Sequence, residues 1–196
     1  RQLPTLMETD LDNIQFEAGG LNHFSILLHA TYKDSGKDGY PLINKNFEGY
    51  YSCLVNDHEG FFSNAGAERG LFFELFKRYG YLPITTDSHL GEYLSWAYSV
   101  ADHDGILDFY DKYKKRCLSF FSNDGYEQFF DMSHPEPHER AIPIIESIVA
   151  DLNMLEHAVN IKNENFIECL PNDIVVEVPA IINKTGVHGK KLDNYP

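Results

Sequence analysis

Several features that this chain lacks narrow the range of its possible functions before any motif is considered. It holds only 16 lysine and arginine residues against 30 aspartate and glutamate residues, which leaves a formal net charge of −14. Nucleic acids and anionic membrane surfaces bind clustered cations, so neither is an expected partner. The sequence also has no apolar run long enough to span a bilayer. We therefore expect a cytoplasmic protein that contacts small molecules or other subunits.

Cysteine and phosphate-binding glycine motifs are also scarce. The cysteines Cys53, Cys117 and Cys169 are odd in number and show no C-x-x-C spacing. This pattern indicates neither a disulfide framework nor a cysteine zinc site. The glycines never form G-x-G-x-x-G between a strand and a helix. The sequence therefore predicts that this chain has no dinucleotide-binding fold of its own.

The residues that are present are typical of one packed domain over residues 1–196. The chain is 43% hydrophobic and 14% aromatic, which excludes a disordered protein. Periodicity predicts strands near 24–31, 157–161 and 172–179, and helices near 64–79, 106–121 and 137–150. The last of these helices is expected to turn Ala141, Ile144, Ile145, Ile148 and Val149 inward. Because strands and helices do not alternate regularly, we expect an α+β fold with a mixed sheet and several long helices.

The first candidate for chemistry is the stretch GLNHF at residues 20–24. It places Asn22 and His23 directly after two glycines and before the apolar run 24–28. A turn that leads into a buried strand holds such side chains at the end of that strand, where a ligand can approach. The imidazole could be a metal ligand or a general base. It could equally be a histidine that is satisfied by a neighbouring carbonyl group.

The second candidate is a segment that is dense in groups able to move protons. Asp87, His89, Glu92 and Tyr93 fall within seven residues, and a helix that begins near Asp87 would bring His89 toward Glu92 and Tyr93. Asp87 could be a helix N-cap or a carboxylate on the rim of a pocket. Tyr93 could accept a proton where a nearby cation favours its phenolate, or it could be an ordinary half-buried aromatic residue. Further along, Arg140 could bind an anionic or hydroxylated ligand, or be a plain surface arginine.

The order of the motifs is more specific than any one of them. GLNHF at 20–24 is followed by DSHLGEYL at 87–94, HERA at 138–141, the asparagine-rich stretch 160–167 and LPNDIVVEVP at 170–179. In this order they resemble the C-terminal domain of family 4 glycoside hydrolases, over nearly all of the chain. The resemblance implies a fold like the C-terminal domain of lactate dehydrogenase. Within the family, the motifs look most like the α-galactosidase, α-glucosidase and α-galacturonidase branches.

The resemblance also implies an activity, the cleavage of α-glycosides with the help of NAD and a divalent metal such as Mn²⁺. In this chemistry the sugar is oxidised at C3, a proton is removed from C2 and the leaving group at C1 is eliminated. Carried over by motif, His23 corresponds to a metal ligand and Asn22 to a substrate-binding residue. Asp87 or Tyr93 would be the catalytic base. His89, Glu92 and Arg140 would contact the sugar, Arg140 at a carboxylate if the sugar has one.

Two departures from the family pattern qualify what this chain would do alone. No cysteine precedes His23, although the family takes a second metal ligand from an upstream cysteine, and the N-terminal NAD-binding domain is absent. We therefore expect an excised C-terminal half that is inactive alone, with NAD and the metal bound only in the full-length protein. The family also implies a homo-oligomer, a dimer or a tetramer. The alternatives are the catalytic domain of a lactate- or malate-type dehydrogenase and a non-catalytic sugar-binding or assembly module.

Overall fold

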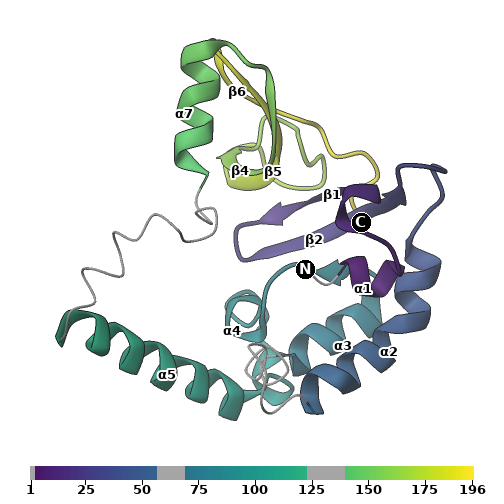
Figure 1. Cartoon of the computed structure of the whole chain (residues 1–196), viewed down its shortest axis with the longest axis vertical. Helices are drawn as coiled ribbons and strands as arrows, with labels where there is room; N and C mark the ends of the chain where they lie inside the picture. The colour runs from purple at the N-terminus through teal and green to yellow at the C-terminus, as the bar shows by residue number, and fades with distance from the viewer. Residues whose placement is uncertain (1–2, 57–68, 123–139) are drawn as a thin grey trace.

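The computed structural model describes residues 3–56, 69–122 and 140–196, and these form an α+β fold in which one sheet carries helices on both sides (Figure 1). Within these ranges, none of the helices combines the length and the apolar character needed to cross a membrane. The helical elements are α1 (Leu3–Met7), a 3₁₀ turn (Leu11–Asn13), α2 (Tyr40–Asn56), α3 (Gly70–Tyr79), α4 (Asp87–Leu90), a 3₁₀ turn (Ala97–Ser99), α5 (His103–Ser122) and α7 (Ala141–Ala150). The strands are β1 (Ile14–Leu21), β2 (Phe24–Tyr32), β3 (Leu82–Pro83), β4 (Met154–Lys162), β5 (Val175–Asn183) and β6 (Gly186–Gly189).

The sheet confirms the expected fold class but corrects one detail of it. Its strand order is β3-β2-β1-β5-β4, and β6 also pairs with β5. The sequence predicted a mixed sheet, but every pairing between the described strands is antiparallel. The physical reason lies in the connections. Strands β1 and β2, and likewise β5 and β6, are joined by two-residue turns, which can connect only antiparallel neighbours.

Strand β2 separates two apolar cores, as its run of hydrophobic residues predicts. Successive side chains of a strand point to opposite faces. Leu27 accordingly packs with the helices α1, α2 and α3, where Phe47 stacks on Phe72 and Phe76. Leu28 faces the other way and packs with residues of β5 and of the C-terminal segment. The hairpin formed by β1 and β2 is therefore fixed from both sides.

The helix boundaries show which sequence signals were sufficient to predict where a helix begins or ends. Helix α3 ends at Gly80, whose left-handed conformation (φ 74°) closes the helix as expected. Helix α5 matches the helix expected over 106–121, and α7 begins so that Pro143 lies in its first turn. The start expected for α7 near residue 137, like residues 64–68 of the first helix, lies outside the described residues.

The inward face expected for α7 is wrong. Val149 is 81% exposed and Ile145 is 55% exposed, and Ala141 also faces outward, whereas Ile144 and Ile148 are half-buried. The fully buried side chain is Ser147, whose hydroxyl group donates to the carbonyl of Ile182 in β5 at 2.7 Å. Because nearly every position of this helix is apolar, its sequence has no polar face to mark the side that packs on the sheet.

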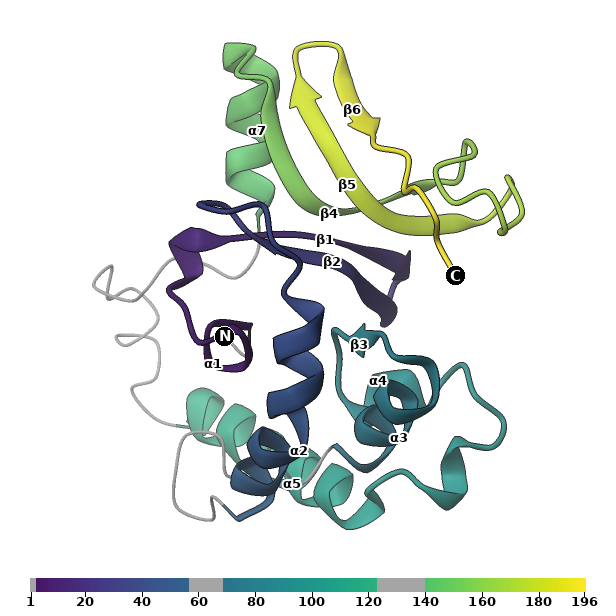
Figure 2. The ribbon, with the colours of Figure 1, turned by 90° about the vertical axis from the view of Figure 1, so that its right-hand side faces the viewer.

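The two ends of the molecule are built from different helices. Helix α7 packs on β4 and β5 at one end, and α3 and α4 lie at the other end, with β1 and β2 between them (Figures 1 and 2). The β1–β2 turn points toward the α4 end, which brings residues 22–23 near residues 85–93.

Candidate metal and substrate site

The candidate site begins at the turn between β1 and β2. Leu21 pairs with Phe24, so Asn22 and His23 alone form the turn. His23 adopts a left-handed backbone conformation, with φ at 67°. This conformation is uncommon for residues other than glycine, although histidine, asparagine and aspartate adopt it more often than most. The turn presents the imidazole of His23 to the solvent-facing side of α4.

The second part of the site comes from α4 and the turn that follows it. The helix consists of a single turn, and backbone hydrogen bonds continue through Glu92 and Tyr93. His89 and Glu92 are three residues apart and therefore lie on one side, with the Nδ1 atom of His89 4.0 Å from Oε1 of Glu92. The expected approach of these two side chains is thus present in the structure.

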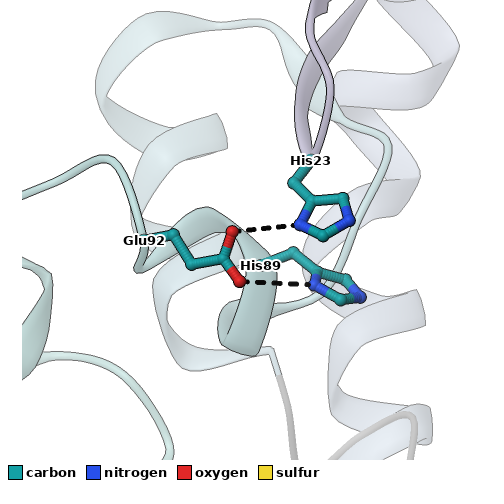
Figure 3. A group of neighbouring side chains, drawn as sticks. All are labelled: His23, His89 and Glu92. Carbon is teal, nitrogen blue, oxygen red and sulfur yellow. Dashed lines mark hydrogen bonds and ion pairs between the residues drawn. The ribbon is translucent and has the colours of Figure 1, made fainter.

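The turn and α4 meet in a cluster of His23, His89 and Glu92 (Figure 3). The Nδ1 atom of His23 lies 3.0 Å from Oε2 of Glu92, and the two imidazole rings lie 4.1 Å apart between centroids. One ligand atom from each residue can be chosen so that all three lie within 4.8 Å of one another. The side chains are 42%, 40% and 53% exposed, so the cluster lies open at the surface.

The donor atoms of this cluster suit a divalent metal ion. Two imidazole nitrogens and a carboxylate oxygen form a set that first-row transition metals bind, and an open site leaves further positions for water or substrate. The carboxylate of Glu92 lies near both histidines. Contacts between side chains as exposed as these contribute little free energy, so little is lost when the three donors turn toward a cation.

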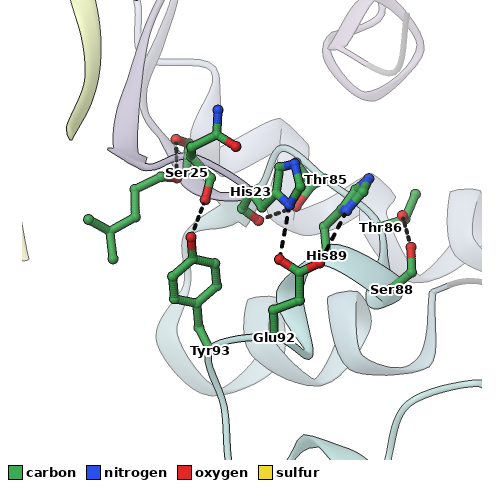
Figure 4. Close-up of polar contacts among 10 residues, drawn as sticks. His23, Ser25, Thr85, Thr86, Ser88, His89, Glu92 and Tyr93 are labelled. Atoms are coloured by element: carbon green, nitrogen blue, oxygen red, sulfur yellow. Dashed lines mark hydrogen bonds and ion pairs between the residues drawn. The ribbon is translucent and has the colours of Figure 1, made fainter. Parts of the chain in front are cut away.

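Tyr93 lies beside this cluster and faces the same turn (Figure 4). Its hydroxyl group donates to the backbone carbonyl of Asn22 at 2.6 Å, and its ring packs against Phe24 with centroids 5.6 Å apart. The residue is 46% exposed. Tyr93 therefore contacts the turn that carries the candidate metal ligand His23 and is also accessible to solvent.

Asp87 occupies a different environment from the cluster. It is 1% exposed, and its carboxylate accepts hydrogen bonds from the backbone N–H groups of Leu71 and Phe72, each at 2.8 Å. A third bond comes from the N–H of Asp102 at 3.2 Å. Asp87 is therefore not the N-cap of its own helix, as its sequence position suggested, because Thr86 holds that position in α4; Asp87 instead caps the N-terminus of α3 from another part of the chain.

The structure does not bring Arg140 to the cluster. Its guanidinium group donates to the buried carboxylate of Glu156 in β4 at 3.1 Å. It therefore belongs to the α7 end of the molecule, on the other side of β1 and β2 from α4 (Figures 1 and 2). A sugar contact by Arg140 stays a prediction, and His138 and Glu139 lie outside the described residues.

The sequence did not identify the residues that support the turn. The hydroxyl group of Thr85 donates to the carbonyl of His23 at 2.7 Å, and Ser25 donates to Oε1 of Glu177 in β5 at 2.7 Å. Glu177 is the single charge in the apolar run 174–178, which is the one signal that could have drawn attention to it. Thr85 carries no such signal.

An apolar pocket of about 420 Å³ opens beside the site. Phe24, Leu90 and Leu94 line it, each of them next in sequence to a residue of the site, together with tyrosines from α3, from the position before β3 and from the C-terminal segment. The apolar pocket and the polar cluster are thus neighbours, with Phe24 lining the pocket and packing against Tyr93.

Comparison with known sequences agrees with the resemblance found in the motifs. The model of the family 4 glycosyl hydrolase C-terminal domain matches residues 18–196. An α-glucosidase of Erwinia rhapontici is 39% identical over 221 aligned positions, which cover all of this chain and 47% of that protein. An α-galacturonidase of Thermoanaerobacterium saccharolyticum is 26% identical, over 93% of this chain and 42% of its own length. The chain thus spans less than half the length of these relatives.

Solved structures show the same fold. A 6-phospho-α-glucosidase from gut microorganisms, in complex with NAD and Mn²⁺, superimposes with a TM-score of 0.64 at 18% identity, covering 99% of this chain and 44% of that one. A 6-phospho-β-glucosidase of Thermotoga maritima, with manganese, NAD⁺ and glucose-6-phosphate, gives a TM-score of 0.53 at 20% identity, over 98% of this chain and 42% of that one. The family match over residues 18–196 shows that the chain belongs to the family 4 glycosyl hydrolases, as their C-terminal domain.

Proposed function

We propose that this chain is the substrate- and metal-binding half of an α-glycosidase that depends on NAD and a divalent metal. The observation that carries the proposal is the cluster of His23, His89 and Glu92 at the end of the β1–β2 hairpin. Family membership supports it, as does the α-glucosidase of Erwinia rhapontici at 39% identity. That relative favours an α-glucoside as the substrate over the galactoside or galacturonide.

In this proposal His23 is the primary metal ligand, and Glu92 and His89 are further candidate ligands that this chain places beside it. A divalent ion such as Mn²⁺ supplies Lewis acidity toward a sugar carbonyl, and NAD supplies hydride chemistry at C3. Both are expected only when this chain is joined to the half that binds NAD. Because a carboxylate and two imidazoles leave coordination positions open, sugar oxygens can approach the same ion as His23.

The next step for this chain's residues is removal of the C2 proton from the sugar. A C–H bond beside a polarised carbonyl is acidic enough for a general base to act on it. We assign this role to Tyr93, acting as the phenolate that a nearby cation would favour, because Tyr93 is exposed beside the cluster, whereas the carboxylate of Asp87 is buried and accepts three backbone N–H groups. Loss of the C2 proton then allows the bond from C1 to the leaving group to break.

Polar groups beside His23 would orient the sugar. Asn22 lies in the same turn, exposed to solvent, and would contact a sugar held over His23; His89, which lies against His23 from α4, would contact it from the other side where it does not bind the ion. A cytoplasmic location, a homo-oligomer and the inactivity of this chain alone stay predictions.

The test joins this chain to its natural upstream sequence and compares His23→Ala with His29→Ala. His29 is an exposed histidine in β2, the strand that follows His23, and serves as the matched control. Nitrophenyl α-glucoside, α-galactoside and α-galacturonide are assayed with NAD and Mn²⁺. We expect turnover that needs the metal, is lost in His23→Ala and is retained in His29→Ala. Turnover without metal, or an active His23→Ala variant, would contradict the metal role.

A second measurement tests the proton removal itself. A substrate that carries deuterium at C2 should lose the label to solvent during turnover, and the loss should stop in Tyr93→Phe. Full retention of deuterium in the product would exclude removal of the C2 proton.

A further inference from the structure

Both backbone carbonyl groups of the turn that carries His23 accept hydrogen bonds from side-chain hydroxyl groups. Tyr93 donates to the carbonyl of Asn22 at 2.6 Å, and Thr85 donates to the carbonyl of His23 itself at 2.7 Å (Figure 4). Both donors come from the segment that also carries His89 and Glu92. The hydroxyl group of Thr85 thus makes a direct hydrogen bond between the β1–β2 turn and the segment 85–93, which together supply the ligands of the cluster.

Thr85 is itself held firmly. It follows β3, which pairs with β2, and the N–H of the preceding residue, Ile84, donates to the carbonyl of Ser25 at 3.1 Å. Its own carbonyl accepts a hydrogen bond from the buried guanidinium of Arg69 at 3.1 Å. The hydroxyl group therefore projects from backbone that is bonded on both sides, which lets it fix the position of a neighbouring turn.

The turn needs such support because of its backbone conformation. His23 has φ at 67°, in the left-handed region that residues with a Cβ atom rarely occupy. A residue keeps this conformation only where its surroundings determine it. Since the imidazole extends from this backbone, any relaxation of the turn would move Nδ1 away from Glu92.

We infer that Thr85 is a positioning residue for His23, and that its hydroxyl group sets the geometry of the metal site without touching the metal. The inference rests on the proposed function, because it takes His23 as a metal ligand. Groups that orient a ligand from behind commonly change metal affinity by about 10–100-fold when they are removed. One neutral hydrogen bond to a backbone carbonyl belongs at the low end of that range.

The experiment measures Mn²⁺ binding to the purified protein in which this chain is joined to its natural upstream sequence, by electron paramagnetic resonance of the free ion, so no activity is needed. Thr85→Val removes the hydroxyl group at constant shape, and Thr85→Ser restores it. Thr86→Val is the matched control, since the hydroxyl of Thr86 contacts Ser88 at 3.1 Å and makes no capping bond to α4. His23→Ala reports whether the ion binds at this cluster. Melting temperatures are recorded for each variant, and Thr85→Ala replaces Thr85→Val if the latter is not folded.

We expect Thr85→Val to weaken Mn²⁺ binding about tenfold, while Thr85→Ser and Thr86→Val bind like the wild type. Equal affinity in Thr85→Val and the wild type, with binding lost in His23→Ala, would overturn the inference and leave the metal role of His23 intact. A similar loss in Thr86→Val would also overturn it, because the effect would then not depend on the bond to His23. Mn²⁺ binding that is absent from the wild type, or unchanged in His23→Ala, would overturn the proposed metal site and this inference with it.

Discussion

Replacement of Asp87 tests whether this residue is a structural cap or a catalytic base. Its carboxylate accepts the N–H groups of Leu71 and Phe72, which are first-turn donors of α3 with no partner inside their own helix. It also accepts the N–H of Asp102, just before α5 begins. Asp87→Ala would leave these donors without an acceptor in a buried place.

The expected magnitude follows from the two short bonds. A hydrogen bond to a charged acceptor contributes about 1.5–3 kcal/mol, and a buried donor without a partner costs about 1–3 kcal/mol. Two such donors give a loss of about 3–5 kcal/mol in the free energy of unfolding for Asp87→Ala. In a chain of this size each kcal/mol lowers the melting temperature by about 2–4 °C, which predicts a fall of about 6–20 °C. Asp87→Asn keeps one acceptor oxygen and should lose about half as much.

Thermal and urea unfolding followed by circular dichroism provide the measurement. Asp108→Ala is the control, because Asp108 is an exposed residue of α5 that pairs with Lys112 at the surface, and its loss should cost less than about 0.5 kcal/mol. The decisive comparison uses Asp87→Asn in the chain joined to its upstream half. A variant that melts like the wild type but no longer exchanges the C2 proton would show that Asp87 acts in catalysis, and the assignment as a cap would be wrong.

Three further predictions concern other parts of the fold. Ser25→Ala removes the donor to the half-buried carboxylate of Glu177 and should lower the free energy of unfolding by about 1–2 kcal/mol in urea, whereas full stability would show that the 2.7 Å bond contributes nothing. Burial raises the pKa of Tyr40 and of Tyr195 to about 12, so stability should be level below pH 10, where both states hold the proton, and fall between pH 10 and 12 as the unfolded state loses it first. Urea midpoints across that range should fall less steeply in Tyr195→Phe, and an unchanged slope would refute the assignment. Gly20→Ala places a Cβ atom 2.5 Å from a backbone carbonyl of the facing strand and should cost about 1–3 kcal/mol, while a wild-type melting temperature would show that the hairpin can relax.

The sequence predicted those parts of the structure that depend on local signals. The strand after GLNHF, the glycine that ends α3 and the proline in the first turn of α7 each have a short-range cause. The closeness of His89 and Glu92 is also local, since helical spacing brings residues three apart together. Each of these features could be read from fewer than ten consecutive residues.

Features that depend on tertiary contacts could not be predicted in this way. Asp87 is 16 residues from Leu71, whose N–H it accepts, and nothing in the sequence marks α3 as a helix that lacks a cap of its own. The outward face of α7 was missed because an almost wholly apolar helix has no polar side to mark its orientation. The contact of His23 with Glu92 joins residues 69 positions apart, so it depends on the tertiary fold and has no local signal in the sequence.

The openness of the cluster limits how firmly a cation could be held there. Side chains that are 42%, 40% and 53% exposed leave part of the ion's surroundings to solvent. Water molecules would fill the vacant positions and exchange rapidly, so a chelator in solution should compete for the ion with little kinetic delay. Such lability also benefits an enzyme, because a sugar hydroxyl has only to displace a loosely bound water molecule to reach the metal.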